Sequence, residues 1–201
     1  MPEKDDMITH GKSPRHLGRH AARLAAVQAI YQWEKIPCST SSLVDEFITY
    51  RFAQASDPEH DVLVDQEFFG KIVTHTLENH ERIDALIKQA LPEGWPFLRL
   101  DSVLRSVLRA GCGEFLKDPS LAAAIVINEY VDIAKDYFDG KEPGFVNGIL
   151  DRVARELDLT LRDDTKAKDV PAHEVEDFLK ACDTTECITW EDEGGGGGGQ
   201  R

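Results

Sequence analysis

Three arginines near the N-terminus have the spacing of one helix face. Arg15, Arg19 and Arg23 stand four residues apart, so each would lie only about 40° around a helix axis from the one before. The guanidinium group offers a planar fork to phosphate oxygens and a flat face to bases, which suits RNA. The stripe therefore predicts an RNA-binding face, with a solvated helix face as the alternative.

A second candidate site combines an aromatic ring with a cation in residues 145–157. The apolar residues of this stretch recur with the period of a helix. Phe145 and Arg152 point in nearly the same direction, on the flank of that apolar stripe. A ring beside a cation can stack on a base of single-stranded nucleic acid. The alternative is that Phe145 packs against a neighbouring helix at the start of its own.

No arrangement of residues predicts a catalytic or metal site. His75 and His80 are five residues apart, which puts them on different faces of a helix. Cys182, Cys187 and His173 lack both the usual zinc spacing and a fourth ligand. The Gly-x-Ser-x-Gly motif of serine hydrolases is also missing. We therefore predict a protein that is not an enzyme and that uses no metal ion and no cofactor.

The composition predicts a globular, cytoplasmic protein. Of the 201 residues, 41% are hydrophobic and 30% are charged, which is enough for a core. The sequence has no run of about eighteen apolar residues that could span a membrane. Its acidic first residues lack the apolar segment of a secretion signal. Four scattered cysteines fit a reducing compartment.

The net charge of −14 is unevenly distributed along the chain. Residues 1–35 carry a net charge of +2, and residues 11–32 contain no acid, whereas residues 158–201 carry −7. A local basic patch attracts nucleic acid even on an acidic protein. The total charge therefore does not exclude RNA as a partner.

The hydrophobic pattern predicts an all-α fold of about seven helices in two small bundles. Helices are expected at residues 18–34, 41–55, 65–90, 99–116, 120–138 and 144–157. Proline and glycine at residues 92–96 separate the two bundles. The predicted domain spans residues 15–158, after a flexible leader at residues 1–14. Residues 159–201 are acidic and end in a six-glycine run, which is typical of a disordered tail.

Four stretches together resemble the NusB family of bacterial transcription antitermination factors. They are AARLAAVQAIYQW at residues 21–33, LRSVLRAGCGEF at 104–115, VINEYVDIAKDY at 126–137 and FVNGILDRVAR at 145–155. The pairing of Val-Ile-Asn-Glu with a later Phe-Val-Asn-Gly-x-Leu-Asp is the most specific feature. With their surroundings, these stretches span residues 15–157, which is the whole predicted domain.

The resemblance implies a helical fold of two subdomains and a function without catalysis. It implies pairing with NusE, a small-subunit ribosomal protein, and joint binding of boxA, a short single-stranded RNA element. Within the RNA polymerase antitermination complex, such a protein promotes read-through, chiefly in ribosomal RNA operons. The resemblance also allows a homodimer that buries the RNA face.

The resemblance places site residues on two surfaces. The positions implied for RNA contact are Arg15, Arg19, His20, Arg23, Tyr31, Phe145 and Asn147, to which the stacking geometry adds Arg152. The positions implied for the NusE surface are Asp101, Arg105, Arg109, Gly113 and Lys141.

Several residues depart from the family pattern. His20 and Ala21 stand where basic residues are common, Gly113 replaces a tyrosine on the expected NusE surface, and Lys141 stands where an acid is common. Asp101 lies about one turn before the usual place of an acid. An alternative function is therefore a NusB-fold interaction module that has weakened or lost RNA binding. A ribosomal RNA methyltransferase with a NusB-like domain is not expected, because the 44 residues after Leu157 are too few for a catalytic domain.

Overall fold

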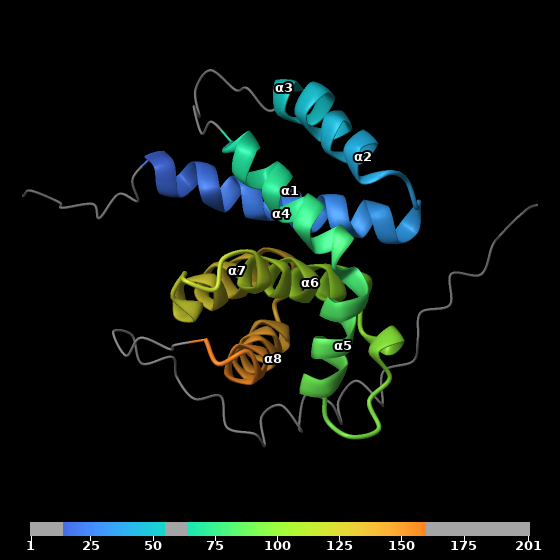
Figure 1. The fold of residues 1–201 in the computed structure, drawn as a ribbon, viewed down its shortest axis with the longest axis vertical. Coiled ribbons are helices and arrows are strands. Elements are labelled where there is room, and N and C mark those ends of the chain that lie inside the picture. Colours follow the sequence, from blue (N-terminus) through green and yellow to red (C-terminus); the bar gives the residue numbers. More distant parts are fainter. Residues whose placement is uncertain (1–13, 55–63, 160–201) are drawn as a thin grey trace, which may run out of the picture.

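The computed structural model describes residues 14–54 and 64–159, and within these ranges it contains helices and no strand. The all-α prediction is confirmed. Figure 1 shows α1 to α4 in the upper half of the view and α5 to α8 in the lower half. Nearly all of the predicted leader and acidic tail lies outside the described residues, as do Cys182, Cys187 and His173.

The first helix, α1 (Pro14–Lys35), is rich in alanine, the best helix former. Proline is tolerated in the first turn of a helix. At the other end, Pro37 follows two residues after Lys35, the last residue of α1, and prevents the helix from continuing. Its start, four residues before the predicted one, puts Arg15 on the helix. Small buried residues such as Ala22, Ala26 and Ala29 let α1 pack against α4 and α6.

The helix predicted for residues 41–55 consists of three consecutive segments, namely α2 (Thr40–Glu46), a π-helical turn (Phe47–Arg51) and α3 (Phe52–Gln54). The Ser39 hydroxyl caps α2 by accepting a hydrogen bond from the Ser42 amide. The buried Phe47 ring stacks on Phe69 of α4, with 5.4 Å between ring centroids. This contact attaches the segment to the core.

The continuous pattern at residues 65–90 forms two helices, α4 (Gln66–Glu78) and α5 (His80–Ala90). Asp65 caps α4 by accepting a hydrogen bond from the Phe68 amide at 3.0 Å. Asn79 separates the helices, and its side-chain amide donates to the His75 carbonyl at 2.8 Å. Local hydrogen bonding by asparagine competes with helix continuation, which explains a break that the apolar period does not predict.

Three helices follow a short 3₁₀ turn at Phe97–Arg99: α6 (Ser102–Lys117), α7 (Ala123–Tyr137) and α8 (Glu142–Glu156). They confirm the three predicted last helices to within a few residues. The Asp101 carboxylate caps α6 by accepting from the Val103 and Leu104 amides. Every residue from Leu104 to Phe115 is buried, which makes α6 the central helix of the fold.

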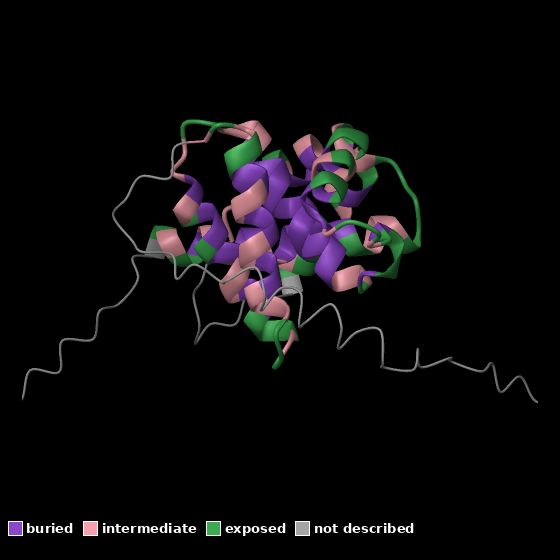
Figure 2. Ribbon diagram, turned by 90° about the horizontal axis from the view of Figure 1, so that it is seen from below, coloured by how far each residue is buried: buried purple, intermediate pink, exposed green. Residues whose placement is uncertain are grey.

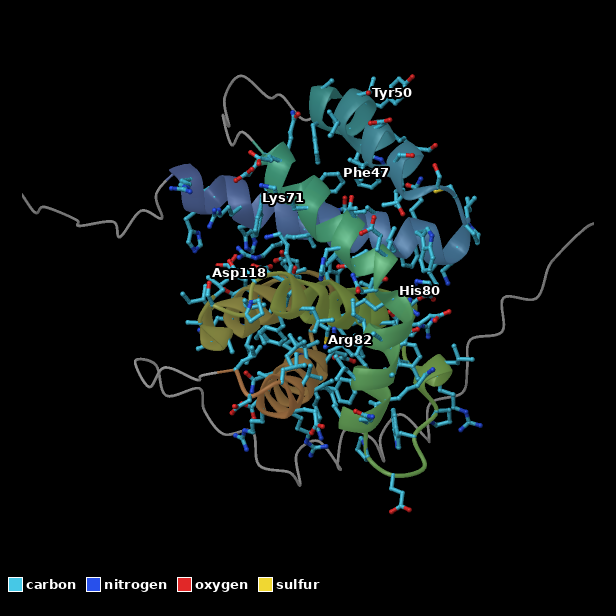
Figure 3. The ribbon with its side chains drawn as sticks, in the orientation of Figure 1. Phe47, Tyr50, Lys71, His80, Arg82 and Asp118 are labelled. Atoms are coloured by element: carbon cyan, nitrogen blue, oxygen red, sulfur yellow. The ribbon has the colours of Figure 1, made fainter. Side chains whose placement is uncertain are left out.

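The two bundles meet on α6. It packs against α1 and α4 on one side and against α5, α7 and α8 on the other. The boundary between the bundles is Asn79 rather than residues 92–96, because α5 packs against α6 and α8. Figure 2 shows one continuous buried interior. Side chains fill the space between the helices (Figure 3), whereas Tyr50 lies at the surface.

Within the described ranges, none of the helices has both the length and the apolar character needed to cross a membrane.

Candidate nucleic-acid interface

The first two turns of α1 carry exposed basic side chains. Arg15 is exposed and the Arg19 side chain is 40% exposed, so both guanidinium groups reach solvent. Arg19 lies 3.8 Å from an Asp65 carboxylate oxygen and 5.0 Å from the centroid of the Phe68 ring. These weak contacts leave the guanidinium planes available to phosphate.

Arg23, the third residue of the predicted stripe, is buried. Its Nε and Nη2 donate to the two carboxylate oxygens of Glu114 at 2.9 and 2.6 Å, and its Nη1 donates to Glu129 at 3.1 Å. Burial alone would lower the pKa of Arg23, but the hydrogen bonds and charge of Glu114 outweigh it and raise the pKa. The prediction that Arg23 contacts RNA does not fit this geometry, because its donors face buried carboxylates.

The same cluster contains a buried tyrosine. The Tyr130 hydroxyl donates to Glu114 Oε2 at 3.1 Å. Burial raises the pKa of Tyr130 well above its usual value, and the charge of Glu114 acts in the same direction. The hydroxyl therefore stays protonated and serves as a donor. Arg23, Glu114 and Tyr130 form a buried polar network that joins α1, α6 and α7.

Two histidines of α1 lie at the edge of this network. His16 Nε2 is 3.0 Å from Glu129 Oε1, and His20 Nδ1 is 3.1 Å from Glu129 Oε2. Both rings are partly exposed, whereas Glu129 is buried. A single carboxylate of α7 therefore holds both rings at the basic end of α1. Glu129 thereby orients both rings, which the sequence pattern did not suggest.

Tyr31 lies three turns further along α1, beside a hollow of about 500 Å³. The hollow lies between α1, Arg51 of the π-helical turn and residues of α6 and α7. The Gln28 amide in its wall donates to the Tyr137 hydroxyl at 3.3 Å. The Tyr31 ring is 37% exposed, so it can meet a ligand as the resemblance implies.

The stacking platform predicted at the start of α8 is not accessible. Phe145 is only 1% exposed and belongs to the core, which supports the packing alternative. Arg152, which was expected beside it, donates to the Ala90 carbonyl at 3.1 Å. Asn147 is half-buried. The structure therefore does not bring Phe145 or Arg152 together with the basic end of α1 on one open face.

Two residues of the predicted NusE surface are exposed and three are buried. Asp101 and Lys141 are exposed, at the starts of α6 and α8. Arg105 and Arg109 are buried. The remaining position, Gly113, is also buried, and a Cβ atom there would lie 2.0 Å from Thr76 Oγ1. The interpretation of Gly113 as a ring missing from the partner surface is therefore wrong, because this position faces α4 in the core.

Arg105 and Arg109 belong to a second buried ion-pair cluster. Both pair with Glu34 at the end of α1, and Arg109 Nε also donates to Asp84 of α5 at 2.7 Å. Burial would raise the pKa of Glu34, but the hydrogen bonds and charges of Arg105 and Arg109 lower it. For Arg109, burial would lower the pKa, but the bonds and charge of Asp84 and Glu34 raise it. These arginines connect helices and do not present their donors to a partner.

The acids that pair with the buried Arg23 are not predicted by the helical pattern. Glu114 and Glu129 each stand among apolar residues of a core helix. A charged residue in such a position is a signal of a buried pair, although the pattern does not tell which cation it meets.

Within the described ranges, no group of three or more His, Cys, Asp or Glu residues is arranged to hold a metal ion. Cys112 is fully buried, and burial raises the pKa of its thiol, so it is unsuited to act as a nucleophile.

Comparison with known proteins agrees with this architecture. The NusB family model matches residues 20–155. The transcription antitermination protein NusB of Mesorhizobium japonicum is 41% identical over 139 residues, which is 69% of this chain and 90% of the relative. The NusB protein of Caulobacter vibrioides is 42% identical over 138 residues, which is 69% of this chain and 93% of the relative. These relatives are named as transcription antitermination proteins, not as enzymes.

Solved structures give the same result. NusB of T. maritima has a TM-score of 0.55 at 28% identity and covers 83% of this chain and 99% of its own. A complex of the antitermination factors NusB and NusE with double-stranded RNA matches with a TM-score of 0.57 at 27% identity, over 68% of this chain and 96% of the matched chain. Arg15 and Arg19 precede the residues that the family model matches. By its sequence and its helical fold, the chain belongs to the NusB family.

Proposed function

We propose that the protein is a transcription antitermination factor that binds boxA-type single-stranded RNA together with NusE. It promotes read-through by RNA polymerase, chiefly in ribosomal RNA operons, and acts in the cytoplasm as a regulator without catalysis. The observation that carries the proposal is the family match over residues 20–155, together with about 40% identity to curated NusB proteins over nearly their whole length.

The exposed end of α1 supports RNA binding by this chain itself. Arg15 and Arg19 offer donors to phosphate, and the rings of His16 and His20 lie beside them on Glu129. Binding that uses a few exposed cations weakens steeply with salt, because each neutralised phosphate releases counterions. The interface is smaller than the sequence predicts, since Arg23 is not available.

The NusE surface in this proposal lies at the starts of α6 and α8. Asp101 and Lys141 are its exposed charged residues, and Lys141 directly precedes α8. Arg105 and Arg109 lie buried in α6, where their ion pairs with Glu34 of α1 and Asp84 of α5 hold the helix in place. Substitution of Lys141 is therefore expected to change NusE affinity with little change in the free energy of unfolding. Substitution of Asp101 also removes the cap of α6, which should cost about 1 kcal/mol.

One observation favours the second candidate, an interaction module with weakened RNA binding. Of the three arginines in the stripe, one is fully paired in the core, and Arg19 lies near the Asp65 carboxylate. The basic end of α1 also borders a hollow of about 320 Å³ whose four acids, among them Asp118, balance its four cations. RNA affinity of the isolated chain is therefore expected to be modest, and NusE is expected to supply the rest.

Fluorescence anisotropy tests the proposal. A labelled boxA-type single strand, a scrambled strand and an RNA duplex are titrated with the full chain, with and without NusE, at two salt concentrations. We expect preference for boxA that increases when NusE is present. Equal, weak binding to all three RNAs, with NusE binding retained, would establish the interaction module instead. Sedimentation of the same samples shows whether a homodimer competes with RNA.

A further inference from the structure

Among the residues that the structure describes, those that line the hollow beside Tyr31 include cations and polar groups but no carboxylate. The side chains that matter to its chemistry are Gln28, Tyr31, Gln32, Lys35, Arg51 and Tyr137. Its apolar floor includes Val27 and Val103. On a chain with a net charge of −14, a wall of this kind is favourable for an anionic ligand.

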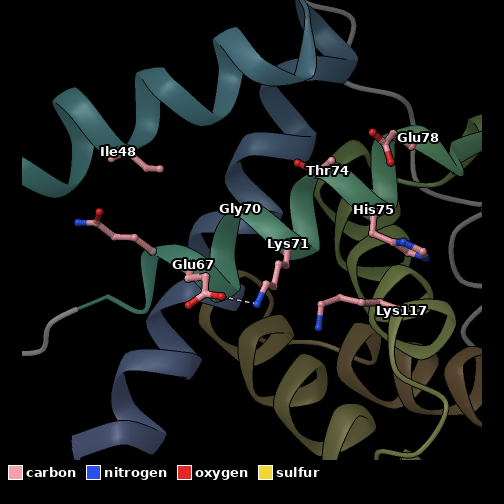
Figure 4. Close-up of a pocket in the computed structure, with 9 residues that line it drawn as sticks. Ile48, Glu67, Gly70, Lys71, Thr74, His75, Glu78 and Lys117 are labelled. Carbon is pink, nitrogen blue, oxygen red and sulfur yellow. Dashed lines mark hydrogen bonds and ion pairs between the residues drawn. The ribbon is translucent and has the colours of Figure 1, made fainter.

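The other large hollows differ in charge. The hollow of about 540 Å³ in Figure 4 is lined by Glu67 and Glu78 as well as by Lys71 and Lys117. The ammonium group of Lys71 pairs with Glu67 one turn away on the same helix. The hollow beside Arg15 is lined by four acids and four cations, so its charges balance, whereas the Tyr31 hollow has two cations and no acid. Electrostatics therefore favours the Tyr31 hollow for RNA.

The polar groups of the hollow are those that recognise a nucleobase. The Tyr31 and Tyr137 rings are 37% and 39% exposed, and unstacked bases stack on such rings. Gln28 Nε2 donates to the Tyr137 hydroxyl, whereas Gln32 accepts a hydrogen bond from Arg51 Nη2 at 3.3 Å and donates through Nε2 to Glu46 at 2.9 Å. The Gln28 amide, held in this way, can donate its second N–H to the edge of a base and accept through its carbonyl oxygen.

The two cations are placed to hold the phosphates next to that base. Lys35 Nζ lies 5.3 Å from the centroid of the Tyr31 ring. Arg51 lies on the π-helical turn, and its guanidinium carbon is 4.9 Å from the centroid of the Phe47 ring. Both side chains are exposed at the rim, so a backbone that passes over the hollow can meet them.

We propose that the hollow binds one nucleobase of single-stranded RNA, stacked on Tyr31 or Tyr137, with Lys35 and Arg51 on the flanking phosphates. The inference rests on the proposed function and extends it, because it adds Gln28, Lys35, Arg51 and Tyr137 to the RNA-binding residues. It places the base-selective part of the interface at the far end of α1 from Arg15.

An abasic scan tests the site with the full chain. Each base of a labelled boxA-type strand is removed in turn, and affinity is measured by anisotropy. One position is expected to show affinity reduced about 5- to 100-fold when its base is removed. That reduction should disappear in Tyr31→Leu or in Tyr137→Leu, whichever variant lacks the ring on which the base stacks, because the removed base and the removed ring interact with each other.

Charge variants test the rim. Lys35→Gln and Arg51→Gln should each reduce the slope of log K against log salt by about 0.7. The matched control is Lys88→Gln, an exposed lysine near the Phe97 ring of the other bundle, which should leave the slope unchanged. Circular dichroism confirms that each variant is folded.

The outcomes separate this inference from the proposed function. If the RNA binds but Tyr31→Leu, Tyr137→Leu and the rim variants all behave as the parent chain, the nucleobase site is wrong and the proposed function stands. If Tyr137→Leu weakens NusE binding without RNA, the hollow takes a protein side chain and the site is also wrong. If no RNA binds with or without NusE, both proposals fail.

Discussion

Arginines on the same helix have opposite roles in this protein. Arg15 and Arg19 lie at the solvent-facing end of α1, whereas Arg23, one turn later, is bonded to two buried carboxylates. The spacing of the three is identical, so helical periodicity predicts their direction but not their depth. Depth is decided by the acids of α6 and α7, which are 91 and 106 residues away in sequence.

The largest change in the free energy of unfolding is expected from Arg23→Met. Removal of the cation leaves Glu114 and Glu129 buried with fewer partners, which should cost about 3–5 kcal/mol of unfolding free energy. Arg19→Met, at the exposed position, should change it by no more than about 0.5 kcal/mol. Urea unfolding followed by circular dichroism measures both. Adding Glu114→Gln and Glu129→Gln to Arg23→Met should recover part of the stability, and no recovery would contradict the ion-pair account.

A similar contrast applies to the aromatic residues. Phe145→Ala should cost about 3–5 kcal/mol, because the ring is a fully buried part of the core. Tyr137→Ala should cost much less, since that ring is 39% exposed. Thermal and urea unfolding report both values. If the Phe145→Ala variant were stable but bound RNA more weakly, the burial argument would be wrong and Phe145 would be a base-stacking residue.

Gly113→Ala sharpens the comparison between surface and core. The new Cβ would meet Thr76 of α4, so the substitution should cost about 1–3 kcal/mol through overpacking. The pair Gly113→Ala with Thr76→Ala should be destabilised by less than the sum of the single variants. Additive effects would show that α4 and α6 can move apart at this point.

The second arginine cluster predicts a pH dependence of stability. Because the pKa of Glu34 is lowered in the folded state, its contribution is complete above the usual value of about 4.5 and disappears as the pH falls through the folded-state pKa. Glu34→Gln should reduce stability at neutral pH by about 2 kcal/mol, and its stability should decline less steeply in acid. Glu78→Gln, at an exposed position, is the control for removal of one carboxylate.

The smallest effect on folding is expected from Arg15→Ala with Arg19→Ala. Unfolding free energy should change by less than about 1 kcal/mol, whereas the salt dependence of RNA binding should fall by about 0.7 for each phosphate that is no longer neutralised. Unchanged RNA affinity would move the interface away from this end of α1. A double variant of Arg19 and Arg23 would mix binding with folding, because only Arg19 is at the surface.

The helices were predicted well from the sequence where prolines mark their ends. Pro37 stops α1, and the segment around Pro119 separates α6 from α7, as expected. The break at Asn79 escaped prediction because the apolar period continues across it, and one side-chain hydrogen bond marks the junction. The candidate site was harder to predict from the sequence. The burial of Arg23 and Phe145 depends on contacts with other helices, which the helical period of one segment does not reveal.

The bonds between α1 and α7 hold the two proposed RNA-binding points at a constant separation. His20 of α1 contacts Glu129 of α7, and Gln28 of α1 donates to the Tyr137 hydroxyl of α7. In each helix these two contact residues are eight positions apart, which is about 12 Å along the helix axis. Two helices joined at both points form a spacer of constant length between the phosphate-binding end and the Tyr31 hollow. The protein is therefore expected to measure nucleotide spacing as well as base identity. An RNA with one nucleotide inserted between the two binding points should engage only one of them.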